Sequence, residues 1–115
     1  MKRLLLCFAV AAIPLANPAS AADSGSITII SPKDGAVLGG GGNKLEYNVH
    51  LSPNGNHLHI YIDNQDPIID KNVSNCPCSI GLPALAAGKH VIAVKEATAG
   101  HALTGVQSTV TVNGK

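Results

Sequence analysis

The sequence of 115 residues predicts an all-β fold, an Ig-like antiparallel sandwich of two sheets with about seven strands in Greek-key order. Short runs in which apolar and polar residues alternate recur over residues 26–112. Clusters of Gly, Pro, Asn, Asp and Ser separate these runs at regular spacing. No stretch in this range has helical periodicity, and the length fits a single domain.

The first expected elements lie in the N-terminal half of this range. Ser26–Ile30 is β-branched and apolar, which predicts a strand, and Ser31–Gly35 follows it as a turn. In that turn Pro32 fixes φ, and its final glycine accepts a positive φ. Lys44–His50 alternates regularly and predicts the next strand, with its apolar residues on one face.

The remaining expected strands are His57–Asp63, a short edge strand at Pro67–Asp70, Cys78–Leu82, His90–Lys95 and Val106–Val112. Residues 71–77 and 97–104 are expected to be loops. The alternation predicts two packed inner faces, formed by Leu45, Tyr47, Val49, Leu58, Ile60, Ile62, Ile92, Val94, Val110 and Val112.

Residues 1–21 are expected to be a cleaved Sec-type signal peptide. Lys2 and Arg3 precede the apolar run Leu4–Ile13, and the small residues Ala19–Ala21 follow as a cleavage signature. The apolar run is too short for a membrane span. Residues 22–115 then form the single Ig-like domain, and the protein is expected to be periplasmic or secreted.

The composition after removal of this segment excludes several classes of function. Six basic side chains face seven acidic ones, which is no electrostatic footprint for nucleic acid or anionic lipid. Tyr47 and Tyr61 are the only aromatic residues left for stacking on bases or sugars. No nucleophile motif is visible, and so small a domain has little room for a deep catalytic cleft. We therefore expect a protein that is not an enzyme.

Several short motifs together resemble the small bacterial Ig-like domains, which are immunoglobulin- or fibronectin-type sandwiches. These motifs are Ser31–Ala36 after the first strand, Ile60–Asp63, Leu85 with Gly88–Ile92, and the closing Val110–Val112. The pair His57 and His59, with the later His90 and His101, is more similar to a His-rich group of uncharacterised secreted proteins. The resemblance implies the fold and export, and it implies no established activity.

The histidines and cysteines are the residues most able to carry chemistry. In an Ig-like sandwich the loops that hold His50, His57, His101 and the pair Cys76 and Cys78 are expected at one end. His57 and His59 lie two apart on a strand, so both imidazoles face the same side. Imidazole nitrogens bind Cu or Zn, and thiolates add affinity for Cu(I) or Zn. The candidate metal ligands are His57, His59, His101, Cys76 and Cys78.

Each of these residues also has a purely structural interpretation. His57, His59 and His101 can be ordinary solvent-facing residues, and His50 can simply end its strand. His90 shares parity with the apolar residues of its strand, so we interpret it as a packed, hydrogen-bonded histidine at the core edge. Asp63, Asp66 and Asp70 lack a calcium-loop pattern and are interpreted as solvated charges.

The two cysteines allow three states. Export favours a disulfide between Cys76 and Cys78. Such a disulfide closes a very small loop and constrains the unfolded chain little, so it is a poor structural staple. A metal dithiolate and free or intermolecular thiols are the alternatives.

These observations lead to two main hypotheses of function. The first is a small exported non-enzymatic binding or accessory module, whose partner is another periplasmic or cell-surface protein. The second is a periplasmic copper or zinc binding protein that uses the histidine end of the sandwich. A thiol redox partner is a third class, disfavoured because no helix N-terminus is available to lower a thiol pKa.

Overall fold

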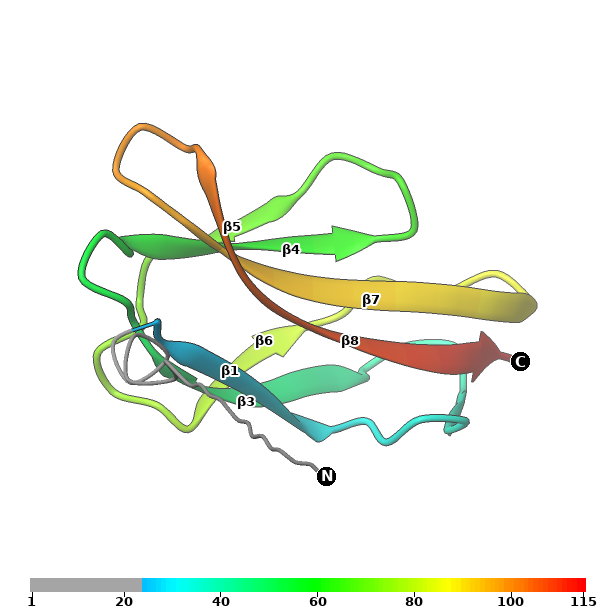
Figure 1. Ribbon diagram of the computed structural model, residues 1–115. Helices are drawn as coiled ribbons and strands as arrows, with labels where there is room; N and C mark the ends of the chain where they lie inside the picture. The colour runs from blue at the N-terminus through cyan, green and yellow to red at the C-terminus, as the bar shows by residue number, and fades with distance from the viewer. Residues whose placement is uncertain (1–23) are drawn as a thin grey trace, which may run out of the picture.

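Two β-sheets pack face to face in the computed structural model, which describes residues 24–115 (Figure 1). The segment expected to be a signal peptide lies outside the described residues. The strands are β1 (Ser26–Ser31), β2 (Val37–Leu38), β3 (Lys44–His50), β4 (His57–Ile62), β5 (Ile68–Asp70), β6 (Cys78–Gly81), β7 (Gly88–Ala97) and β8 (Leu103–Gly114). The smaller sheet has the order β1-β3-β6 and the larger one the order β2-β8-β7-β4-β5. The predicted all-β sandwich is confirmed.

The predicted strands all form, and the main differences concern β2, β7 and β8. β2 was not predicted, because two residues are too few to show alternation, and it pairs with β8 in parallel rather than antiparallel. β7 continues to Ala97 and β8 begins at Leu103, so the expected loop at 97–104 is shortened to residues 98–102. Cross-strand hydrogen bonding along the β7–β8 hairpin overrides the weak strand propensity of its Gly and Ala residues.

The core lies between the sheets, as the alternation predicts. Leu45, Leu58, Ile60, Ile92 and Val94 have no exposed surface. Among the predicted core residues, only Val49, near the end of β3, is half-buried rather than buried. The even-numbered residues of β4 and β7 therefore point into the core, and the odd-numbered residues of both strands must face outward.

Tyr47 carries a polar atom into this core and finds a partner across the sandwich. Its hydroxyl donates a hydrogen bond to the Asp70 carboxylate, which links β3 of one sheet to β5 of the other. Burial raises the pKa of Tyr47, and the bond to Asp70 raises it further. The interpretation of Asp70 as a solvated charge was wrong, because the buried phenol needs an acceptor.

A bulge shapes the β7–β8 hairpin. Lys95 pairs with Gln107, but Ala97 pairs with Leu103, so three residues of β8 face Glu96 alone. Gly105 lies within the bulge at a φ of 100°, a conformation that L side chains rarely adopt. The start of β8 consequently bends away from the plane of the sheet, and Figure 1 shows the β7–β8 loop rising beside β4 and β5.

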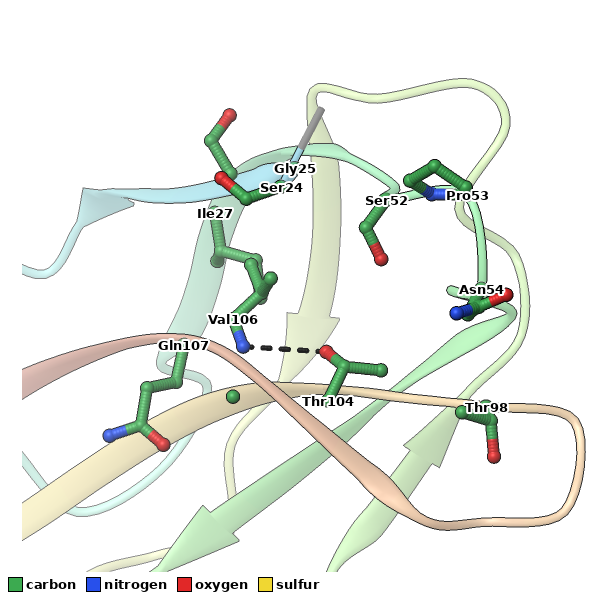
Figure 2. Close-up of a pocket in the computed structure, with 12 residues that line it drawn as sticks. Ser24, Gly25, Ile27, Ser52, Pro53, Asn54, Thr98, Thr104, Val106 and Gln107 are labelled. Atoms are coloured by element: carbon green, nitrogen blue, oxygen red, sulfur yellow. Dashed lines mark hydrogen bonds between the residues drawn. The ribbon is translucent and has the colours of Figure 1, made fainter. Parts of the chain in front are cut away.

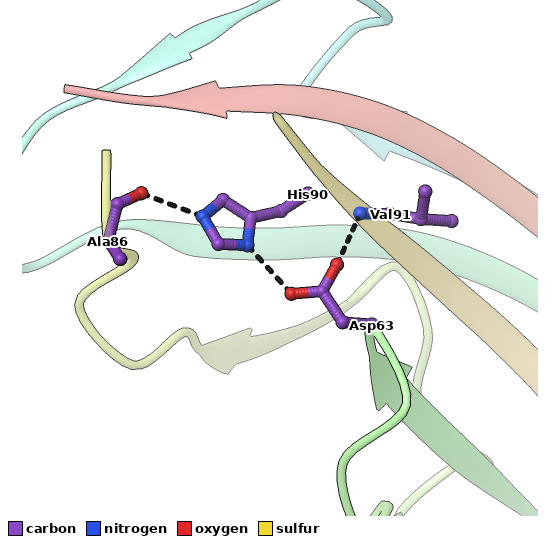
Figure 3. A network of polar contacts seen from close by, with 4 residues as sticks. All are labelled: Asp63, Ala86, His90 and Val91. Atoms are coloured by element: carbon purple, nitrogen blue, oxygen red, sulfur yellow. Dashed lines mark hydrogen bonds and ion pairs between the residues drawn. The ribbon is translucent and has the colours of Figure 1, made fainter. Parts of the chain in front are cut away.

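The loops β3–β4, β5–β6 and β7–β8 gather at one end of the sandwich (Figure 1), as the topology predicted. The opposite end holds a separate histidine network, shown in Figure 3. His90 Nδ1 lies 2.7 Å from Asp63 Oδ2, and its Nε2 lies 2.7 Å from the Ala86 carbonyl oxygen. Asp63 Oδ1 accepts a third bond, from the Val91 amide. The prediction that His90 is a hydrogen-bonded residue at the core edge is confirmed. Asp63, which was interpreted as a solvated charge, is exposed and is also the partner of His90.

This network predicts a defined pH dependence of stability. The bonds to Asp63 and to the Ala86 carbonyl raise the pKa of His90, since both acceptors favour the protonated ring. The bond with His90 lowers the pKa of Asp63. The His90 contribution is complete below the unfolded pKa, about 6.5, and is lost as pH rises through the folded one. The Asp63 contribution is present above its unfolded pKa, about 3.9, and is lost as pH falls through the folded one.

Asp63→Asn removes the charge from this pair, and asparagine tolerates the positive φ of 56° at this position. We expect the variant to be destabilised most between about pH 4 and 6.5, with a difference that shrinks toward pH 9. Urea unfolding of both proteins across this range measures the difference. A difference that is constant with pH would show that the charged pair contributes nothing.

Candidate metal centre

Three histidine ring nitrogens converge at the end of the sandwich where the β3–β4 and β7–β8 loops meet. His57 Nε2 lies 3.0 Å from His59 Nε2 and 3.1 Å from His101 Nδ1. The third side of the triangle, from His59 Nε2 to His101 Nδ1, measures 3.3 Å. Among the described residues, this is the group of histidine, cysteine and carboxylate side chains that could together hold a metal ion.

Two different local structures bring these rings together. His57 and His59 are alternate residues of β4, so both project from the outer face of the larger sheet. His101 lies in the β7–β8 turn at a φ of 72°, a conformation uncommon for histidine. The bulge opposite Glu96 directs this turn toward the outer face of the larger sheet. The His101 ring nitrogen thereby becomes the third corner of the triangle, on the outer side of β4.

The burial of the triangle is uneven. His57 and His59 have only 1% and 6% of their surface exposed, whereas His101 is exposed. The interpretation of His57 and His59 as ordinary solvent-facing residues was wrong. They do project from the outer face, but the ring of His101 from the β7–β8 turn lies against them there.

The second ring nitrogen of each buried histidine also has a partner. His57 Nδ1 lies 2.9 Å from Asn56 Oδ1, an atom that can only accept, so Nδ1 carries the proton. In the neutral ring the Nε2 lone pair is then directed at the other two histidines. His59 Nδ1 lies 3.3 Å from the Tyr61 hydroxyl. Such outer partners fix ring orientation in metal sites.

Both buried rings are held in the neutral form that metal binding needs. Burial is the main cause that lowers the pKa of His57, followed by the neighbouring His101, His59 and Lys71. Burial and His101 lower the pKa of His59 in the same way. Two neutral imidazoles therefore present lone pairs to one point in space, together with a third imidazole.

The size of the triangle matches a transition-metal ion. Bonds of about 2.0–2.1 Å from one ion to three nitrogens separated by 3.0–3.3 Å subtend about 100° at the ion. This angle lies between the octahedral and tetrahedral values. The three nitrogens can thus act as one face of the coordination sphere of Cu or Zn.

The other candidate ligands lie elsewhere. Cys76 and Cys78 form a disulfide with each other, and Cys78 packs in the core at the start of β6, where it pairs with Tyr47 of the smaller sheet. The outer face that carries the histidines is on the far side of β4 from this core. His50 ends β3 and is exposed there. The structure brings together His57, His59 and His101, and it does not bring Cys76, Cys78 or His50 to them.

A buried carboxylate that was not predicted from the sequence connects the segments beside the site on the inner face of the sheet. Glu96 has no exposed surface and accepts hydrogen bonds from the Ser52 amide (2.8 Å), the Ser52 hydroxyl (2.5 Å) and the Thr104 hydroxyl (2.6 Å). Burial alone would raise the pKa of Glu96, but these bonds outweigh it and lower the pKa. Ser52 and Thr104 also line a pocket beside Glu96, and Figure 2 shows them on opposite sides of it.

Glu96 thereby joins the loop that leads into His57 to the strand that leaves His101. Its even parity with Ile92 and Val94 was a signal for inward orientation, but the predicted strand ended before it. Gly55 is required beside it, because a Cβ there would lie 2.3 Å from Glu96 Oε2.

Glu96→Gln tests this brace. The neutral amide keeps one acceptor oxygen but replaces the other with an NH₂ group. That group would face the donors of Ser52 or Thr104 and could not accept their hydrogen bonds. We expect a loss of about 1–3 kcal/mol in the free energy of unfolding, measured by urea denaturation. Glu46→Gln, at an exposed position of β3, is the matched control, and it should change stability little. Equal stability of the two variants would mean that Glu96 does not brace the two loops.

Comparison with known proteins supports the fold. The sequence matches no family model and no curated protein sequence. Its structure is similar to the fibronectin(III)-like modules of CbhA from Clostridium thermocellum, with a TM-score of 0.58 and 17% sequence identity. The match covers 77% of this chain and 95% of the module. The chain therefore has an Ig-like, fibronectin-type sandwich fold. Residues 24–115 contain no helix that could cross a lipid bilayer.

Proposed function

We propose that this protein is a small exported, non-enzymatic binding module that holds one copper or zinc ion through His57, His59 and His101. The observation that carries the proposal is the triangle of ring nitrogens, with sides of 3.0, 3.1 and 3.3 Å. Two of the three rings are buried, neutral and oriented by outer partners. Export rests on the charged, apolar and small-residue segments within residues 1–21.

The alternative role for such a cluster is structural, as a hydrogen-bonded knot. One proton carried on His101 Nδ1 can be shared by the Nε2 lone pairs of His57 and His59. This already gives each of the three nitrogens a hydrogen-bond partner. The exposure of His101 argues against a purely structural role, because a solvated ring needs no such partners. A metal-ligating side chain that solvent can reach, such as His101, is the feature expected of a binding site.

Neutral imidazoles suit both metals, and divalent ions at such ligands follow an order in which copper exceeds nickel and zinc. Isothermal titration of the purified domain with Cu(II), and separately with Zn(II), tests the proposal. We expect binding of one ion per chain at pH 7.5, with copper tighter, and a steep loss of affinity below about pH 6 as protons compete. Weak binding without a defined stoichiometry would contradict the proposal and leave the domain as a module that binds a protein partner.

A further inference from the structure

We infer that the metal ion held by the three histidines keeps an open coordination position that takes a small monodentate anion, and that Lys71 and Lys95 attract this anion. The inference rests on the proposed metal binding. It concerns a different property of the same site, namely what the metal binds next.

The coordination geometry leaves one side of the ion free. Three nitrogens that subtend about 100° at the ion occupy a single face of its coordination sphere, whether the ion is four- or six-coordinate. The positions that remain lie on the side away from the three rings. Metal sites with three protein ligands typically hold a water molecule or an exogenous ligand in such a position.

No anionic side chain of the described residues belongs to the cluster. The two carboxylates nearest along the flanking strands are engaged on the other face of the sheet. Asp70 accepts from the Tyr47 hydroxyl, and Glu96 accepts from Ser52 and Thr104. A divalent ion bound by three neutral imidazoles therefore keeps its full charge of two.

The charged groups that flank the cluster on its own face are both cations. Leu58 pairs with Asp70, so the next residue of the chain, Lys71, lies beside His57, and the two interact electrostatically. His59 pairs with Lys95 on the other neighbouring strand. The Lys95 ammonium lies over the Tyr61 ring, 5.1 Å from its centroid, so it stays on the outer face, on the side of His59 away from His57.

The result is a concentration of positive charge with no compensating protein anion. Two ammonium groups and a divalent ion attract an anion by simple electrostatics, and the open position allows it to bind the metal directly by displacing water. Neutral ligands of similar size lack this attraction. The site is thus expected to prefer small anions over neutral donors.

Azide is the probe that tests this inference, with the Cu(II)-loaded full domain as the target. Copper binding is measured first, by titration, in wild type, Lys71→Gln, Lys95→Gln and the double variant. Azide is then titrated into each copper-loaded protein, and the azide-to-copper charge-transfer absorption is followed together with the electron paramagnetic resonance spectrum. Lys89→Gln is the matched control, because Lys89 lies on the same strand and face as Lys95 but at the other end.

We expect saturable azide binding, with one azide per copper, in wild type and in Lys89→Gln. Each single lysine variant should bind azide about threefold more weakly, and the double variant about tenfold more weakly, while copper affinity is unchanged or slightly higher. Spectra unchanged by azide in a protein that holds one copper would overturn the inference and leave the proposed function intact. Azide binding by the double variant as tight as in wild type would overturn the role of the lysines. Failure to bind copper would overturn both proposals.

Discussion

Replacement of His57 and His59 together by leucine is expected to abolish stoichiometric copper and zinc binding. Leucine has a similar volume and removes both Nε2 lone pairs, which leaves His101 as a single exposed ligand. One imidazole on a turn cannot compete with water for a divalent ion at micromolar concentration. Isothermal titration of wild type and variant with Cu(II) and Zn(II) under identical conditions measures the loss.

A control with the same number of histidines removed is available in the chain. His50→Gln combined with His90→Gln changes a strand end and the Asp63 network but leaves the triangle intact. It should bind one ion with unchanged affinity and lose only stability. Because leucine at two buried positions can disturb folding, His101→Asn provides a second test at an exposed residue. Asparagine tolerates the φ of 72°, and the variant should stay folded and bind metal more weakly. Retention of full affinity by either histidine-site variant would exclude the triangle as the metal centre.

Truncation of Ile60 to alanine is expected to cost about 2–5 kcal/mol of unfolding free energy. Ile60 has no exposed surface and lies in the middle of β4, between Val94 of β7 and Ile68 of β5. A cavity there cannot collapse, because strands on both sides are fixed by the sheet. The melting temperature should fall by about 8 °C or more for a domain of this size.

Ile69→Ala is the matched control for this prediction. Ile69 is the same residue type on the neighbouring strand, but it lies on the outer face and is 41% exposed. It should cost much less, because most surface substitutions change stability by about 0.5 kcal/mol or less. Equal losses in the two variants would contradict the assignment of inner and outer faces, on which the position of the histidines also depends.

The fold was largely predictable because alternation is a local signal. Leu58, Ile60 and Ile62 are two apart, so the sequence alone placed them on one face and the histidines of β4 on the other. The order of strands then predicted which loops share an end. β2 escaped prediction because its pairing depends on β8, which is distant in the sequence.

The candidate site was predictable only in part. The sequence indicated that His57 and His59 face the same side and that His101 lies at the same end. It did not indicate that the pair is buried, because that depends on the bulge around Gly105, which bends the hairpin over the outer face. The hydrogen bonds of Glu96 and Asp70 were also missed. Their partners are 44 and 23 residues away along the chain, and no local pattern reports such contacts.

X-ray absorption spectroscopy of the protein loaded with one copper or zinc ion tests the central claim most directly. The account predicts three imidazole nitrogens at about 2.0–2.1 Å, with the outer-ring scattering typical of histidine and no sulfur. A sulfur shell at about 2.3 Å would contradict it, because the ion would then be bound by Cys76 or Cys78 rather than by the three histidines.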